Sequence, residues 1–152
     1  MKKIIKWILV LLCMLTIFFF SSDNANKSTK KSNGLIIQIS QLFVGHKLSG
    51  EEKETNIELY DKFLRKSAHF TLYFILGLLI VNAIYEYKLE ETKMILIALL
   101  IAFLYACSDE IHQLFVPGRS GEILDVLIDT LGSLTGIMVY YYVTKIWRRK
   151  HE

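Results

Sequence analysis

The stretch YACSDEIHQ at residues 105–113, followed by VPGR at 116–119 and by the pair Asp125-x-x-x-Asp129, decides the fold of this chain. It places acids, a histidine, an amide and an arginine at the end of one apolar segment and inside the start of the next. Ionisable groups at membrane depth are costly, so they usually face a protein interior or a wet cavity and mark a functional site. The stretch therefore predicts where the protein acts, although it specifies no reaction.

Apolar runs fill much of the remaining chain. Hydrophobic residues make up 53% of the 152 residues, more than a soluble domain of this size usually carries. Four runs approach the ~20 residues that cross a hydrocarbon core. We predict an all-α integral membrane bundle in one domain, 1–152, with transmembrane helices at about 4–20, 68–87, 93–113 and 123–147.

The first run could instead be a signal peptide, because Lys2 and Lys3 precede it. No small-x-small cleavage site follows the FFFSS sequence at 18–22, however, and such a site is expected after a cleaved leader. We therefore expect an uncleaved membrane helix.

Basic residues predict the orientation of the bundle. Lysines cluster at 2–6, and lysine and arginine cluster at 145–150, so the positive-inside rule places both termini in the cytoplasm. The loop between the first two helices is then external. Apolar stripes at helical spacing predict amphipathic helices in this loop: 35–43 as a short helix on the membrane interface, and 57–67 as a stripe that runs into the second transmembrane helix. A soluble cap packed over the site is the alternative.

Polar residues share faces when they are placed on the predicted helices. The spacings of three and four residues place three such stripes at the same outer boundary, which predicts one outward-open pocket. Its acids outnumber its Lys and Arg, so we expect a protonated carboxyl group, a charged histidine or a bound cation to offset the excess. The candidate ligand-binding residues are Lys66, His69, Tyr73, Asp109, Glu110, His112, Gln113, Arg119, Asp125 and Asp129.

Two classes of function fit these residues. In a binding site, Lys66 and Arg119 would hold a phosphate or carboxylate of an envelope molecule. In an enzyme, His112 or His69 would act as general base, with Asp109 or Glu110 orienting it or binding a divalent metal. No known hydrolase or metalloprotease signature is present, so we favour binding. The sequence identifies no cofactor and no definite set of metal ligands.

Two of the candidates also have plain structural interpretations. Arg119 would pair with Asp125 or Asp109 to fix the turn at Pro117-Gly118. Glu110 lies about 100° from Asp109 around the helix, so it would simply be solvated. A third function, ion conduction, is disfavoured because the first two helices offer almost no polar residues at mid-depth.

Three motifs resemble the VanZ-like family: RKxxHFxxYxxLG at 65–77, DExHQxFxPGR at 109–119 and DxxxDxxGxxxG at 125–136. The FFFSS end of the first helix is also similar, and the resemblance covers nearly the whole chain. Where some family members carry an acid before the tyrosine, this chain has Leu72.

The resemblance implies a small multi-pass protein of the bacterial cell membrane, from a family linked to teicoplanin resistance. The function expected from it is binding of an envelope lipid, a cell-wall precursor or a glycopeptide. An enzyme acting on a lipid or polyprenyl head group is the alternative. Membrane lipids are the expected partners, and no nucleic acid is expected.

Overall fold

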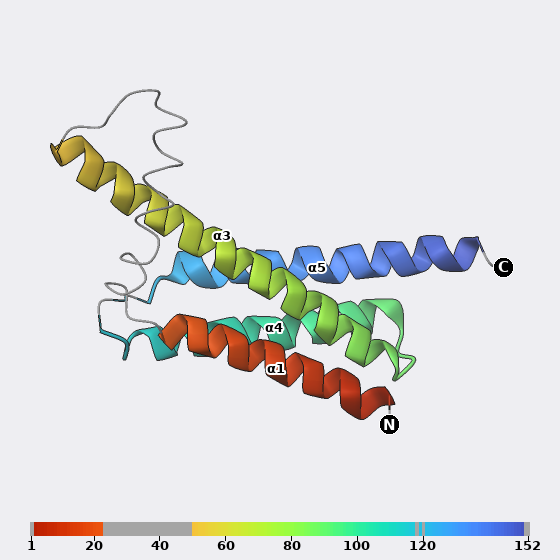
Figure 1. The fold of residues 1–152 in the computed structure, drawn as a ribbon. Helices are drawn as coiled ribbons and strands as arrows, with labels where there is room; N and C mark the ends of the chain where they lie inside the picture. The colour runs from red at the N-terminus through yellow and green to blue at the C-terminus, as the bar shows by residue number, and fades with distance from the viewer. Residues whose placement is uncertain (1, 23–49, 118, 120, 151–152) are drawn as a thin grey trace.

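The computed structural model describes residues 2–22, 50–117, 119 and 121–150, and within these the regular structure is entirely helical. The helices are α1 (Lys2–Ser22), α3 (Gly50–Tyr85), α4 (Glu91–Gln113) and α5 (Ile123–Arg149) (Figure 1). Each contains a stretch long and apolar enough to cross a membrane: Lys3–Ser22, Lys62–Tyr85, Glu91–Gln113 and Ile123–Arg149. The predicted all-α bundle with four membrane-length helices is therefore confirmed.

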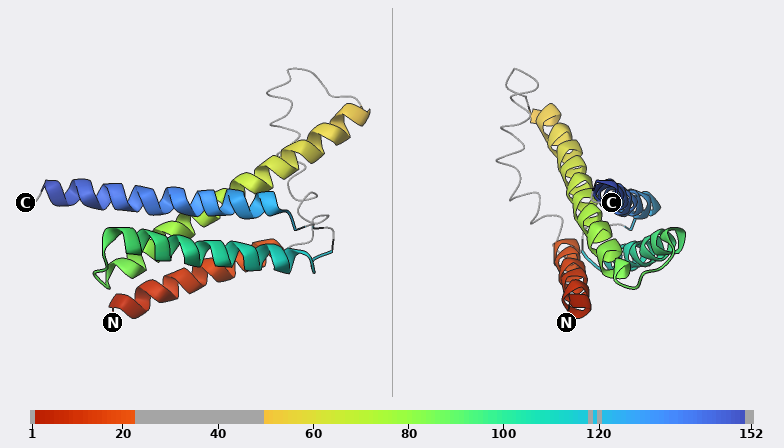
Figure 2. Two further views of the ribbon diagram at one scale, coloured as in Figure 1. Left: turned by 180° about the vertical axis from the view of Figure 1, so that it is seen from behind. Right: turned by 90° about the vertical axis from the view of Figure 1, so that its right-hand side faces the viewer.

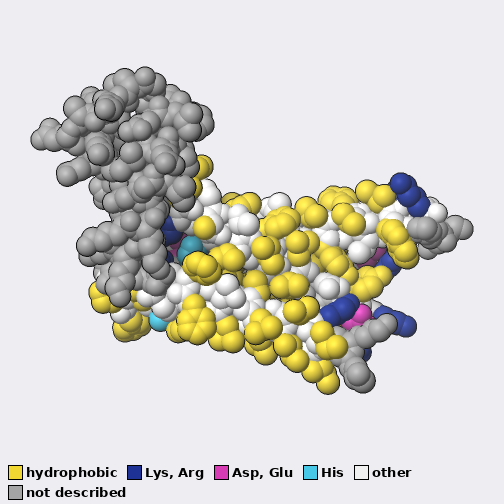
Figure 3. Space-filling model, viewed as in Figure 1, with side chains coloured by type: hydrophobic (Ala, Val, Ile, Leu, Met, Phe, Trp, Pro, Cys, Tyr) yellow, Lys and Arg dark blue, Asp and Glu magenta, His cyan; other side chains and the backbone are white. Residues whose placement is uncertain are grey.

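The surface of the bundle is that of a membrane protein. Large apolar side chains are exposed along α1, including Leu11 and Phe19, where a soluble helix bundle would carry polar groups. On the face shown in Figure 3, hydrophobic side chains cover the length of the bundle, and charged side chains gather at its two ends. This distribution matches an apolar band with polar boundaries.

The helices are arranged around α3, which crosses the bundle obliquely and packs most extensively against α5 (Figure 2). α1 lies against α3 and α4. Both termini and the α3–α4 turn lie at one end, which we call the termini end (Figure 1). The end of α1 and the α4–α5 connection lie at the opposite end, the site end.

The predicted amphipathic segments have different outcomes. Residues 35–43 lie outside the described part of the chain. Residues 57–67 belong to α3, which begins at Gly50 and continues without interruption into the membrane span. This second stripe therefore runs into the second membrane helix, as the sequence predicted.

Small residues determine how closely α3 and α5 approach. Ideal Cβ atoms at Gly77 and Gly136 would collide with backbone of the facing helix, and one at Gly132 would lie 2.6 Å from the Phe70 carbonyl oxygen. Ser133 Oγ donates to the Tyr73 carbonyl oxygen across the same contact, at 3.1 Å. Such close backbone contact is the usual means by which membrane helices associate.

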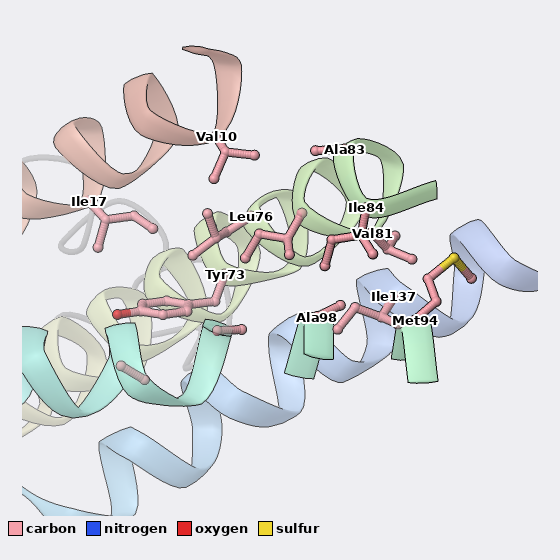
Figure 4. Packing of buried hydrophobic residues seen from close by; sticks show 13 residues of the cluster. Val10, Ile17, Tyr73, Leu76, Val81, Ala83, Ile84, Met94, Ala98 and Ile137 are labelled. Carbon is pink, nitrogen blue, oxygen red and sulfur yellow. The ribbon is translucent and has the colours of Figure 1, made fainter. Parts of the chain in front are cut away.

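The buried face of α4 follows the same principle. Met94, Ala98, Ala102 and Ala106 recur every four residues and form part of the apolar core (Figure 4). The next buried positions on this helix are Asp109, Glu110 and Gln113. The face that packs the apolar core therefore becomes polar at the site end.

At the turn between α3 and α4, both helix boundaries differ by two residues from the approximate ranges predicted from the sequence. α3 ends at Tyr85, because a turn with Tyr87 N–H donating to the Ile84 carbonyl and Lys88 at φ 52° reverses the chain. α4 begins at Glu91, whose negative charge is favourable in the first turn of a helix.

The orientation of the bundle is a testable prediction. A reporter that is active only outside the cytoplasm should be active when fused after Glu51 and inactive when fused after Glu90, because Lys and Arg gather at the termini end. A cytoplasmic fluorescent reporter at the same two positions provides the reciprocal control. Extracytoplasmic activity after Glu90 would reverse the predicted orientation.

Candidate functional site

A polar cluster occupies the site end, and all four helices contribute to it. We define the polar cluster as Ser21, Ser22, Arg65, Lys66, His69, Tyr73, Asp109, Glu110, His112, Gln113, Arg119, Glu122, Asp125 and Asp129. All ten candidate residues from the sequence lie in it. Their contacts differ, however, and divide the cluster into a buried centre and a more exposed rim.

Asp109 is at the centre and is almost fully buried. Its Oδ2 atom accepts hydrogen bonds from Ser21 Oγ at 2.8 Å and from Gln113 Nε2 at 3.3 Å. Its Oδ1 atom is buried and has no hydrogen-bond partner among the described residues. One carboxylate oxygen is therefore held in place by α1 and α4, while the other is left without a donor.

His69 faces two carboxylates. Its Nδ1 atom lies 3.9 Å from Asp109 Oδ2 and 3.7 Å from Asp129 Oδ2. Both separations exceed hydrogen-bonding distance. Asp129 has no exposed surface, and within the described chain neither of its carboxylate oxygens receives a hydrogen bond. These three side chains, one from each of α3, α4 and α5, are the residues that could hold a metal ion.

Tyr73 lies directly beside this group. Its ring stacks on His69 with centroids 6.5 Å apart. It is fully buried, and its hydroxyl has no hydrogen-bond partner among the described residues. In Figure 4 the hydroxyl points along α3 toward the site end.

Glu110 is buried and not solvated, so the plain surface interpretation of this residue is wrong. Its Oε2 accepts the backbone N–H of Glu122 at 2.9 Å, and its Oε1 accepts from Gln113 Nε2 at 3.1 Å. The first of these bonds crosses the α4–α5 connection. Glu110 therefore ties the end of α4 to the start of α5.

Lys66 lies on the rim, where it forms ion pairs with Asp125 and with Glu122, the latter at 3.1 Å. The hydrogen bond and the positive charge of Lys66 lower the pKa of the Glu122 carboxyl group. Asp125 is thus a partner of Lys66. The lysine is already bound to two acids, so an anionic ligand would compete with them.

Arg119 and His112 contact α1. Arg119 Nη2 donates to the Phe20 carbonyl oxygen at 3.1 Å. His112 Nε2 lies 3.0 Å from Ser22 Oγ, and its ring stacks on Phe18 with centroids 4.3 Å apart. His69, and not His112, is therefore the histidine that faces the central carboxylates.

The cavity within the cluster is small. It has a volume of about 10 Å³ and is lined by both basic and acidic side chains, among them Arg65, Arg119, Glu110 and Asp129. This space suits about one water molecule or ion. The described residues bring seven of the ten candidates around this small cavity, and the larger outward-open pocket stays a prediction. A larger cavity of about 560 Å³ lies at the termini end. Most of its Lys and Arg side chains are part of the basic clusters from which the cytoplasmic location of this end is predicted.

Sequence reasoning missed four members of the cluster: Ser21, Ser22, Arg65 and Glu122. A signal was available for three of them. Ser21 and Ser22 are the first consecutive hydroxyls after the long apolar run, at the depth predicted for the site. Glu122 is three residues before Asp125, so extending that helical face by one turn would have included it.

Four membrane-length helices with buried ionisable groups at one end define a small multi-pass membrane protein with a polar site. Residues 6–147 match the VanZ/LLP1 family model. Because this match spans most of the 152 residues, the chain belongs to the VanZ/LLP1 family. No curated protein and no solved structure matches it significantly.

Proposed function

We propose that the polar cluster binds the head group of a bacterial envelope amphiphile, which is an envelope lipid, a cell-wall precursor or a glycopeptide. The observation that carries this proposal is the burial of Asp109, Glu110 and Asp129 at one end of an otherwise apolar bundle. Buried acids are costly in a membrane protein, and in such proteins they usually mark a site of binding or transport. Packing alone gives no reason for three of them at one depth.

The rim indicates the charge of the ligand. Three basic residues, Arg65, Lys66 and Arg119, line the small cavity beside three acids. Mixed charge on a protein surface is complementary to mixed charge on its ligand. A head group with a phosphate or carboxylate beside an amine has that property. Arg65 and Arg119 are the better anion-binding residues, because guanidinium groups bind such oxygens in pairs.

The position of the head group follows from the cavity size. A space of about 10 Å³ excludes a whole head group. The ligand would therefore lie over the mouth of the cavity, with its acyl or polyprenyl chain beside the apolar surface of the helices. With the termini in the cytoplasm, this mouth opens at the outer membrane boundary, where precursors and glycopeptides meet.

This location connects binding to drug resistance. A protein that binds the precursor or the glycopeptide at the outer membrane boundary lowers the amount of glycopeptide bound to its precursor target, by mass action. We propose that this protein contributes to glycopeptide resistance, including teicoplanin resistance, in that way.

Arg119→Gln and Arg65→Gln should each weaken ligand retention by about tenfold, because each removes one charge-assisted contact. Native mass spectrometry of protein extracted from its own membrane would measure the bound amphiphile. Teicoplanin susceptibility of cells carrying each variant would give the second readout, with falling resistance expected.

Lys62→Gln is the matched control. Lys62 is an exposed basic residue on α3, the helix that carries Arg65, and it does not line the cavity. It should behave as wild type. Wild-type protein that retains no amphiphile and leaves susceptibility unchanged would contradict the proposal.

A second candidate is an enzyme that acts on a lipid or polyprenyl head group. The observation that favours it is the position of His69 between two carboxylates, at 3.7 and 3.9 Å. A general base held by acidic partners is a common catalytic arrangement. Turnover of a polyprenyl or glycerolipid substrate by purified protein, abolished in His69→Gln and retained in His112→Gln, would place this candidate first.

A further inference from the structure

We propose that His69, Asp109 and Asp129 bind one divalent transition-metal ion, Zn²⁺ or Mn²⁺, at the junction of α3, α4 and α5. Each residue offers one ligand atom, and the three atoms lie within 4.8 Å of one another. Two ligands that are each about 2.1 Å from a metal lie at most about 4.2 Å apart. The separations of 3.7 and 3.9 Å from His69 Nδ1 fall inside that limit, and all three pairs lie within 4.8 Å, so the metal needs only a small closure of the group.

Buried atoms without partners provide the second observation. Both oxygens of Asp129, one oxygen of Asp109 and the Tyr73 hydroxyl are buried and lack hydrogen-bond partners among the described residues. Buried polar atoms are nearly always satisfied, so a group of four in one place requires an explanation. The Tyr73 hydroxyl belongs to neither acid, and it points along α3 toward the site end (Figure 4).

The charge of the group favours a divalent ion over a protonated histidine. Two buried carboxylates carry two negative charges, whereas a charged His69 supplies one positive charge and lies beyond hydrogen-bonding distance of both. A divalent cation neutralises the pair and coordinates their oxygens directly. The metal therefore accounts for the charge and gives at least one unpartnered oxygen of Asp129 a ligand bond.

The surrounding contacts resemble those that orient metal ligands. Ser21 Oγ and Gln113 Nε2 donate to Asp109 and fix its carboxylate, as outer-sphere groups do in metal sites. One imidazole and two carboxylates suit Zn²⁺ or Mn²⁺ better than Cu⁺ or Ca²⁺. Three protein ligands leave coordination positions open, and the adjoining cavity has room for one water molecule.

The experiment uses full-length protein in detergent, stripped with chelator and then titrated with Zn²⁺ or Mn²⁺. Wild type should bind one ion per chain and unfold at a higher temperature with metal than without it. Asp129→Asn and His69→Gln should each weaken binding by tenfold or more, since removal even of an outer-sphere group costs about 10- to 100-fold. Glu90→Gln is the control: Glu90 is an exposed acid just before α4, at the termini end, and pairs with Lys93, so binding should be unchanged.

The change in unfolding temperature on adding metal is measured within each variant, so a general loss of stability does not imitate a loss of binding. A variant-free arm uses electron paramagnetic resonance of Mn²⁺ bound to wild type, which should show coupling to one imidazole nitrogen. No binding by wild type, no nitrogen coupling, or equal binding by Asp129→Asn would each overturn the metal site. No amphiphile is added, so failure here leaves the proposed head-group binding untouched, and the reverse also holds.

Discussion

Gly136→Ala is expected to lower the free energy of unfolding by about 3 kcal/mol, at the upper end of what overpacking usually costs. The added Cβ would collide with the Phe74 carbonyl oxygen of α3. This neighbour is backbone, so it moves only if the two helices separate. Helix propensity alone predicts the opposite sign, because alanine is favoured over glycine by about 1 kcal/mol in a helix. Unfolding of the purified protein in a denaturing-detergent titration would measure the change.

Thr135→Ala is the control for Gly136→Ala. Thr135 is exposed on the neighbouring position, and its hydroxyl donates to the Leu131 carbonyl of its own helix. Its replacement should leave stability nearly unchanged. Gly77→Ala affects the same interface from α3, because its Cβ would meet the Ser133 carbonyl oxygen. The two glycine changes together should therefore cost less than their sum. A Gly136→Ala protein as stable as wild type would contradict the close contact.

The convergence of polar side chains was predictable because it depends on local spacing. His69 and Tyr73 are four residues apart on one helix, and Asp125 and Asp129 are four apart on another. Helical spacing fixes which of these residues share a face. Apolar length fixes where the helices cross the membrane, and hence the depth of each polar group. Helical spacing and apolar length together therefore predict the helical bundle and which polar residues gather at one end of it.

The partners within the site were not predictable in the same way, because they depend on how helices cross. His112 shares a face with Asp109 in the sequence, yet its neighbours are Ser22 and Phe18 on α1. Glu110 is buried because the start of α5 folds back over it and donates a backbone N–H. Neither contact has a periodic signal in the chain.

The size of the cavity was also beyond sequence reasoning. Spacing places charges near one another, but it does not say whether they bind each other or leave room for a ligand. Lys66 pairs with Asp125 and Glu122, and the remaining space is about 10 Å³. Among the described residues, the predicted acidic excess persists at the centre, where Asp109 and Asp129 face one histidine, His69.

His69→Leu is expected to destabilise the metal-free protein by about 3 kcal/mol or more, as the loss of one partner from a buried ion pair does. The change removes the basic side chain whose Nδ1 atom lies 3.9 Å from Asp109 Oδ2 and 3.7 Å from Asp129 Oδ2. Asp129→Asn removes one of the two charges, so the double variant His69→Leu/Asp129→Asn should regain about 1–3 kcal/mol relative to additive behaviour. Chelator in every sample keeps this measurement separate from metal binding.

His112→Leu is the matched control for this rescue, because His112 contacts Ser22 and Phe18 and not the central carboxylates. It should cost about 1 kcal/mol, the value of one ordinary hydrogen bond. Adding Asp129→Asn to His112→Leu should recover no stability, because His112→Leu takes no partner away from a buried carboxylate. If Asp129→Asn instead destabilised both histidine variants equally, His69 would not be balancing the two buried carboxylates. The sign of the coupling therefore decides whether the polar centre is held together by charge or only by packing.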